Sequence, residues 1–137
     1  MHHKIPVRIY YEDTDAGGIV YHANYLKFAE RGRTEFLRNC GFLNSQLEKD
    51  QGFLFVVRHI DVDYLKPAYL DDELVMHSSI LDLKNSSFVM QQSLYRKDEL
   101  VCDLRVVLVC VDSKKHKPVR LPETIKEAFQ NRQDSVS

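Results

Sequence analysis

Residues 11–25 read YEDTDAGGIVYHANY. The run brings two carboxylates, Asp13 and Asp15, a pair of glycines and His22 close together in the chain. It joins a segment with strand-like alternation to the start of a long amphipathic segment. Such a junction combines a charged side chain, a tight turn and the free N–H groups of a helix N-terminus. We therefore expect the chemistry of the protein here.

Downstream of this run, residues 21–40 repeat apolar side chains every three or four positions, which predicts an amphipathic helix that Gly41 ends. Gly32 lies within the apolar stripe, although glycine costs about 1 kcal/mol relative to alanine in an isolated helix. We therefore expect a sheet to approach the helix closely at Gly32. The stripe consists of Tyr25, Phe28, Ala29, Gly32, Phe36, Leu37 and Cys40.

The remaining segments alternate with a period of two, which predicts β-strands. The expected strands are 5–11, 54–65, 73–83, 88–95 and 100–111, with a short helical or irregular piece at 45–50 and a C-terminal helix at 122–129. Short turns between consecutive strands predict antiparallel pairing. The expected fold class is α+β, a curved five-stranded antiparallel sheet wrapped around one long central helix.

A single helix cannot cover both faces of such a sheet, so a partner subunit is expected on the other face. In the last strand the even positions are apolar and face the core. The odd positions turn apolar from Val107 to Val111, which indicates contact with another subunit. We therefore expect a homo-oligomer, either a dimer or a homotetramer built from dimers.

Composition limits the possible classes of protein. The 137 residues suit one domain, with a core at about 5–112 and a tail at 113–137. The formal net charge of −1 does not favour nucleic acid or an anionic membrane as a partner. No apolar stretch approaches the roughly 20 residues of a membrane span, and the start lacks the apolar core of a signal peptide. The three cysteines contain no Cys-x-x-Cys pair, so we expect reduced thiols and a cytoplasmic protein.

Residues 11–25 have three other possible interpretations. An EF-hand calcium loop starting at Asp13 would place Gly17 and Asn24 at ligand positions five and twelve, so two ligands are lost. A P-loop fails because no Gly-Lys-Ser/Thr follows. A plain strand-to-helix turn accounts for the glycines and one aspartate, but not for two aspartates, a histidine and tyrosines in one place.

The pattern Tyr-x-Asp-Thr-Asp-x-x-Gly-x-Val-Tyr-His-x-Asn-Tyr resembles the 4-hydroxybenzoyl-CoA thioesterase family, and within it the YbgC-like acyl-CoA thioesterases. The resemblance continues through residues 30–37, 63–68 and 72–74 and covers roughly residues 5–112. It implies the hotdog fold, which agrees with the order of elements derived above. It also implies an enzyme that hydrolyses acyl-CoA to free acid and coenzyme A, with no separate cofactor and no metal.

The resemblance assigns the catalytic carboxylate to Asp15, as nucleophile or general base, and an active-site role to His22. It implies that the backbone N–H groups of Tyr21 and His22 polarise the thioester carbonyl. Asp13, Gly17 and Gly18 are expected to support the turn. His22 has a plainer alternative as a polar residue at the helix start.

Substrate contacts are expected at Val20, Tyr21, Arg58, Ser86 and Ser87, although a solvated surface position is the simpler explanation of the last three. Two other functions stay open. One is hydrolysis of acyl groups carried by acyl-carrier protein. The other is a non-catalytic hotdog partner of a cell-envelope (Tol-Pal) or phospholipid-synthesis complex, with which YbgC-like proteins are associated.

Overall fold

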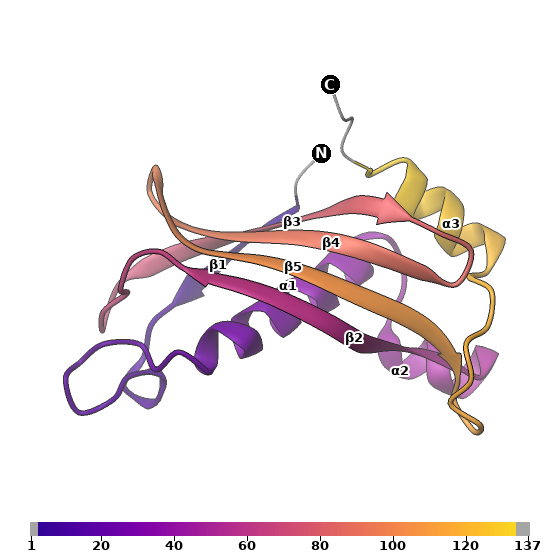
Figure 1. The fold of residues 1–137 in the computed structure, drawn as a ribbon, viewed down its shortest axis with the longest axis horizontal. Helices are drawn as coiled ribbons and strands as arrows, with labels where there is room; N and C mark the ends of the chain where they lie inside the picture. The colour runs from indigo at the N-terminus through magenta and orange to yellow at the C-terminus, as the bar shows by residue number, and fades with distance from the viewer. Residues whose placement is uncertain (1–2, 134–137) are drawn as a thin grey trace.

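The computed structural model describes residues 3–133, which form five strands around one long helix (Figure 1). Strand β1 and the 3₁₀ turn η1 precede helix α1, and two short helical pieces lead into four consecutive strands and a last helix. The elements are β1 (His3–Arg8), η1 (Tyr11–Asp13), α1 (Asn24–Asn39), α2 (Asn44–Gln46), η2 (Leu47–Gln51), β2 (Phe53–Tyr64), β3 (Glu73–Leu83), β4 (Ser87–Arg96), β5 (Glu99–Asp112) and α3 (Glu123–Gln130).

The sheet is fully antiparallel, with strand order β1-β3-β4-β5-β2. Helix α1 runs along one face of the curved sheet, and α3 lies at one end of it (Figure 1). The 11–23 segment lies at the opposite end, at the N-terminus of α1 (Figure 1). The predicted α+β class and the curved five-stranded sheet around a central helix are confirmed.

Helix α1 buries the stripe that its sequence predicts. Phe28, Ala29 and Phe36 are almost fully buried against the sheet, while Cys40 at the helix end is only partly buried. At Gly32 the sheet approaches so closely that an added Cβ would lie 2.8 Å from the Met76 Cγ atom. The predicted close approach at Gly32 is therefore confirmed.

One buried polar side chain ties α1 to the sheet. Gln92 is fully buried on the core face of β4, and its amide nitrogen donates to the Ala29 carbonyl at 2.8 Å and to the Ser78 hydroxyl at 3.0 Å. Its amide oxygen accepts a 3.0 Å hydrogen bond from Arg33. These bonds satisfy an amide that would otherwise cost free energy in the core.

Two predicted boundaries near the N-terminus were wrong. Strand β1 ends at Arg8, and α1 begins at Asn24 rather than near Tyr21. The late start of α1 has a long-range cause. The Val20 N–H donates to the Ala68 carbonyl at 2.9 Å and holds this part of the chain extended, so the helix starts only after a turn.

The odd-numbered face of β5 also differs from the expectation. Val109 and Val111 are 7% and 4% exposed within the single chain, so they offer no apolar surface to a partner. Val111 forms a bridge with Pro118, and the Val119 N–H donates to the Cys110 carbonyl at 2.9 Å. The tail that follows β5 therefore runs alongside the end of that strand.

Cysteine labelling should distinguish the three thiols, none of which forms a disulfide. Burial raises the pKa of Cys102 to about 12 and that of Cys110 to about 11, whereas Cys40 is partly exposed. Because the thiolate is the reactive form, iodoacetamide at pH 8 should modify Cys40 first, and the other two only after unfolding. Mass spectrometry of native and denaturant-treated samples would measure this. Equal labelling of all three in the native protein would contradict the described packing.

Candidate active site

Asp15 stands in a tight loop closed by the chain itself. The Asp15 N–H donates to the Ile19 carbonyl at 2.9 Å, and the Gly18 N–H donates back to the Asp15 carbonyl at 3.0 Å. Gly18 has φ +75°, which other residues rarely adopt. The Gly17 N–H donates to the Asp15 Oδ1 atom at 2.9 Å. The loop therefore fixes one carboxylate oxygen and leaves the other exposed, with no hydrogen bond from residues 3–133.

Asp13 anchors the base of this loop. Its side chain is 8% exposed, and its Oδ2 atom accepts a 2.9 Å hydrogen bond from the Tyr10 N–H. Its carbonyl accepts hydrogen bonds from the Tyr21 N–H at 3.0 Å and from the Asn24 side-chain amide at 2.8 Å. These contacts suit a supporting role for Asp13 rather than a chemical one.

The backbone donors near the helix start are fewer than the sequence suggested. The Tyr21 N–H is taken up by the Asp13 carbonyl, so the expected role of Tyr21 as an oxyanion donor does not fit this structure. The N–H groups of Asn24 and Tyr25 also donate to backbone carbonyls. Within the described part of the chain, the N–H groups of His22 and Ala23 make no hydrogen bond. They are the donors available to a ligand.

A cavity of about 220 Å³ adjoins these donors. Its walls include Ile19, Val20 and His22 from the loop side, Tyr64 at the end of β2, and Lys66 just after that strand. The His22 ring lies 6.1 Å from the Tyr64 ring, edge to face, and 4.5 Å from the ring of Tyr21. The cavity has the apolar walls and few polar groups of a ligand site, although it is small for one.

Two tyrosines line this cavity. Tyr25 of α1 is 4% exposed, and its ring lies 5.6 Å from that of Tyr64. Burial raises the pKa of both phenols, so both stay neutral at physiological pH. They therefore act as apolar walls and hydrogen-bond donors rather than as bases.

The segment 67–72 forms hydrogen bonds to the Asp15 loop and is itself bonded to Arg96. The Leu70 N–H donates to the Gly18 carbonyl at 3.2 Å, which adds to the Val20–Ala68 bond. The Arg96 guanidinium donates to the Pro67 carbonyl at 2.9 Å and to the Asp72 carboxylate at 2.8 Å, and it also pairs with Glu99. The hydrogen bonds to Glu99 and Asp72 raise the pKa of Arg96. Arg96 thus ties the end of β4 to the backbone that shapes the Asp15 loop.

Replacing Arg96 with alanine should impair activity more than stability. The loss of the bond to Pro67 frees the segment that carries the loop, and a shift of about 1 Å in a catalytic group can cost 10²-fold in rate. We expect kcat for acyl-CoA hydrolysis to fall by roughly 10- to 100-fold with little change in KM, while Tm falls by a few degrees. Steady-state kinetics and thermal unfolding measure both. Arg38→Ala, which removes only an exposed pair with Glu35, is the matched control. Equal kcat in the two variants would contradict a positioning role.

The structure gathers some of the predicted site residues and separates others. Asp15, Val20, Tyr21 and His22 share the loop, and of these Val20 and His22 also line the cavity beside it. Ser86 and Ser87 lie at the far end of β4, about 30 Å from its Arg96 end. Arg58 is exposed on β2, at a register irregularity between Val57 and His59. Within one chain these three residues are not brought to the Asp15 loop.

The sequence analysis did not identify Tyr64 as a functional position, nor Arg96 as a residue that positions the loop. Tyr64 packs against His22, and Arg96 holds the 67–72 segment in place. A signal for Tyr64 was present, because it lies in the 63–68 stretch that carries the family resemblance. Nothing in the sequence pairs Arg96 with Pro67, since 29 positions separate them.

Residues 3–133 contain neither a cluster of metal ligands nor a membrane-spanning helix. Among residues 3–133, no group of three or more His, Cys, Asp or Glu side chains could hold a metal ion. Over the same range, no helix has the length and apolar character needed to cross a membrane.

Comparison with known proteins identifies the family. Residues 10–129 match the model of the thioesterase-like superfamily. The chain is 44% identical over 126 residues to the acyl-CoA thioesterase YbgC of Haemophilus influenzae, covering 92% of this chain and 93% of the relative. A probable thioesterase of Bartonella henselae is 38% identical, with a TM-score of 0.85 over 89% of this chain and all of that one.

A third likeness shows the fold alone. It is to an aspartate-to-asparagine mutant of 4-hydroxybenzoyl-CoA thioesterase in complex with 4-hydroxybenzoyl-CoA, at 20% identity and a TM-score of 0.88, over 93% of this chain and 98% of that one. The other two matches extend over nearly the whole length of both chains. The chain therefore belongs to the thioesterase-like superfamily, and within it to the YbgC-type acyl-CoA thioesterases.

Proposed function

We propose that this protein hydrolyses acyl-CoA thioesters to a free acid and coenzyme A at the Asp15 loop. The observation that carries the proposal is the pairing of an exposed, oriented carboxylate with the unbonded N–H groups of His22 and Ala23. Thioester hydrolysis needs a base or nucleophile and a donor for the oxyanion, and this loop supplies both. The YbgC relatives bear the name acyl-CoA thioesterase, which supports the same substrate class.

Two courses of reaction satisfy this arrangement. In one, an Asp15 oxygen attacks the thioester carbonyl, the C–S bond breaks, coenzyme A leaves as a thiolate, and water hydrolyses the resulting anhydride. In the other, Asp15 takes a proton from water as the water oxygen attacks the carbonyl, the C–S bond then breaks to give the free acid, and the departing coenzyme A thiolate takes up the proton that Asp15 holds. In both, negative charge develops on the carbonyl oxygen, and the His22 N–H donates to it. The His22 ring, between Tyr21 and Tyr64, orients the acyl group or the water.

We propose further that the active form is a homo-oligomer joined through β2. This strand lies at the edge of the sheet, and its side chains Val56 and Val57 are 37% and 43% exposed. Exposed apolar side chains on a long edge strand favour pairing with a second copy. Tyr64 and Leu65, beside the cavity, are about half exposed in the single chain and would gain cover. Light scattering should give the mass of a dimer or tetramer, and a monomer would contradict this proposal.

An initial-rate panel tests the proposed reaction. Wild-type protein is assayed with a series of acyl-CoAs and with the same acyl groups on acyl-carrier protein, and free thiol is followed. Faster release from acyl-CoA supports the proposal. Faster release from the carrier protein would favour an acyl-carrier-protein thioesterase. Absence of turnover on both would favour the non-catalytic partner of a Tol-Pal or phospholipid-synthesis complex.

The three free, unpaired cysteines suit the expected cytoplasmic location.

A further inference from the structure

The two proposed oxyanion donors, the N–H groups of His22 and Ala23, lie in a turn that leads into α1. The Asn24 N–H closes this turn by donating to the Tyr21 carbonyl at 2.9 Å. The N–H groups of the two residues after Asn24 donate to the carbonyls of His22 and Ala23, each at 3.3 Å. Hydrogen bonds of that length are weak. The start of the helix therefore does little to fix the two donors.

No side chain caps this end of α1. The N-cap residue is Ala23, which has no polar side chain, and the first turn of the helix contains no acidic residue. A capping oxygen would accept one of the N–H groups that a ligand needs, and an acidic side chain would offset the positive end of the helix dipole. The uncapped start therefore suits an oxyanion, but it leaves the turn without the usual support.

The Asn24 side chain supports the turn in another way. Asparagine is a preferred N-cap residue, yet Asn24 lies one position beyond the N-cap, and its amide nitrogen donates to the Asp13 carbonyl at 2.8 Å. The same carbonyl oxygen accepts the Tyr21 N–H at 3.0 Å. Asn24 is 9% exposed, so little water can replace its hydrogen bond. Both ends of the turn that carries His22 and Ala23 are thus bonded to one oxygen atom.

The Asp13 carbonyl is in turn fixed relative to Asp15. The Asp13 side chain is 8% exposed and accepts the Tyr10 N–H at 2.9 Å. Thr14, between the two aspartates, forms a bridge with Val20. Loss of the Asn24 amide would therefore free the donor side of the site and leave the Asp15 side intact.

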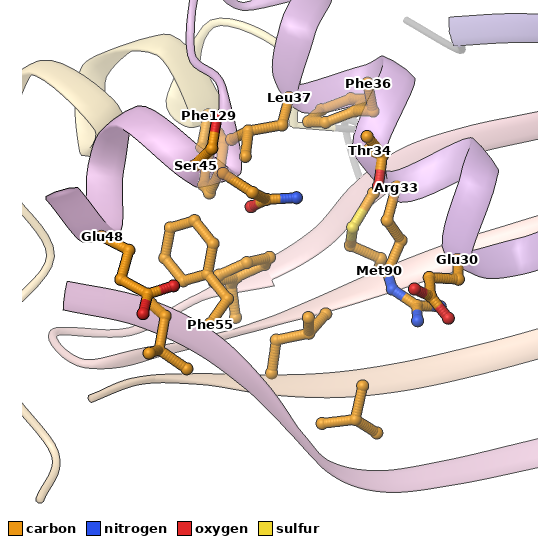
Figure 2. Close-up of a pocket in the computed structure, with 15 residues that line it drawn as sticks. Glu30, Arg33, Thr34, Phe36, Leu37, Ser45, Glu48, Phe55, Met90 and Phe129 are labelled. Carbon is orange, nitrogen blue, oxygen red and sulfur yellow. The ribbon is translucent and has the colours of Figure 1, made fainter. Parts of the chain in front are cut away.

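Asn24 does not line the cavity beside His22. It does not line the larger cavity of about 380 Å³ either, which lies farther along α1 and is lined by Arg33, Phe36 and Phe55, among others (Figure 2). Arg33 is nine positions beyond Asn24, about 14 Å along a helix. Asn24 can therefore influence the reaction only through the backbone that it holds.

We propose that Asn24 is a positioning residue for the hydrolysis. Its amide, acting through the Asp13 carbonyl, holds the His22 and Ala23 N–H groups where the thioester oxygen gains negative charge. This inference rests on the proposed function and identifies a residue on which the rate depends without contact with the substrate. Aspartate cannot replace Asn24 in this role, although it is equally favoured at helix starts, because an ionised carboxylate only accepts hydrogen bonds.

Replacing Asn24 with alanine should lower kcat for butyryl-CoA by roughly 10- to 100-fold, because a donor displaced by about 1 Å loses much of its effect. KM should change by less than about threefold, since no contact with the cavity is lost. Steady-state kinetics separates the two constants. Asn24→Asp, which keeps the size of the side chain without its donor, replaces Asn24→Ala if that variant fails to fold.

Ser78→Ala is the matched control for lost stability. The Ser78 residue is 1% exposed, and its hydroxyl accepts the buried Gln92 amide at 3.0 Å, so the variant also lacks one buried hydrogen bond. A Cβ added at Gly32 would lie 3.1 Å from this hydroxyl, and Gly32 is eight positions beyond Asn24, about 12 Å along α1. Ser78→Ala should therefore lower Tm as Asn24→Ala does and leave kcat unchanged.

An infrared measurement detects the action of the donors on the substrate. Butyryl-CoA with an isotope-labelled thioester carbonyl is bound to Asp15→Asn, which should turn over slowly, and the C=O stretching frequency is recorded. Hydrogen bonds to the carbonyl oxygen lower this frequency. Adding Asn24→Ala should shift the band back toward that of free butyryl-CoA, whereas adding Ser78→Ala should leave it in place. A general loss of stability does not move the band of the folded, ligand-bound protein.

The outcomes separate the two proposals. A lower kcat in Asn24→Ala, together with the return of the band, supports the positioning role. An unchanged kcat, an equal loss of kcat in Ser78→Ala, or a band that does not move overturns this role while leaving acyl-CoA hydrolysis by wild type intact. A wild type inactive on every acyl-CoA would overturn the proposed function and this inference together.

Discussion

Replacement of Asp15 with asparagine is expected to lower kcat for acyl-CoA hydrolysis by about 10²- to 10⁴-fold. The asparagine oxygen can still accept the Gly17 N–H that the Asp15 Oδ1 atom accepts at 2.9 Å, so the loop should keep its shape. The change removes the negative charge and the exposed second oxygen, which either attacks the carbonyl or takes the proton from water. Initial rates of thiol release at saturating acyl-CoA measure the effect.

This change should leave the thermal stability of the protein nearly unaltered. Asp15 is exposed and makes no ion pair within residues 3–133, so Asp15→Asn should unfold within a degree or two of wild type. Asp50→Asn, at an exposed carboxylate in η2, is the matched control and should retain full activity. A large loss of Tm in Asp15→Asn would mean that any loss of rate reflects misfolding, and the assignment of Asp15 would lose its support.

Replacement of Gly32 with valine should destabilise the protein by about 3 kcal/mol or more, because there is no space for the larger side chain between α1 and the sheet. Even a single Cβ would lie 2.8 Å from Met76 Cγ, 2.9 Å from Gln92 Nε2 and 3.1 Å from Ser78 Oγ. Met76 is fully buried, and Gln92 is fixed by its bonds to Ala29 and Ser78, so neither can move away cheaply. Chemical denaturation measures the loss.

A graded series makes this prediction specific. Gly32→Ala gains about 1 kcal/mol of helix propensity but still meets the short contacts, so its loss should be smaller than that of valine. Lys27→Val places the same β-branched side chain on the exposed face of α1 and should cost less than about 1 kcal/mol. Equal stability of Gly32→Val and Lys27→Val would contradict the close packing of helix and sheet.

The secondary structure was largely predictable from sequence because each element buries one face. Strands β2 to β5 fell within one or two residues of their predicted ends, since alternation marks a strand with one side in the core. Helix α3 begins after Pro122, as its sequence indicates. The stripe on α1 predicted both its buried face and the close approach at Gly32. The resemblance at residues 11–25 located the candidate site.

Features that depend on distant pairing could not be predicted. The start of α1 is delayed because Val20 and Tyr21 bond to Ala68 and Asp13, and no local pattern encodes these partners. The hydrogen bond from the Tyr21 N–H to the Asp13 carbonyl also removes this N–H from the candidate oxyanion donors. The strand order, with β2 at an edge, is likewise a tertiary property. Only Gln92 gave a weak local indication of its buried hydrogen bonds, because it is a polar residue between the apolar residues of the core face of β4.

The catalytic role of Asp15 is tested by a single turnover of butyryl-CoA, with wild type or Asp15→Asn in excess over the substrate. Wild type should release all of the coenzyme A, whereas folded Asp15→Asn should release it hardly faster than buffer does. A folded Asp15→Asn that matches wild type would contradict the role of Asp15. Butyryl-CoA left intact by wild type would contradict hydrolysis of this substrate itself.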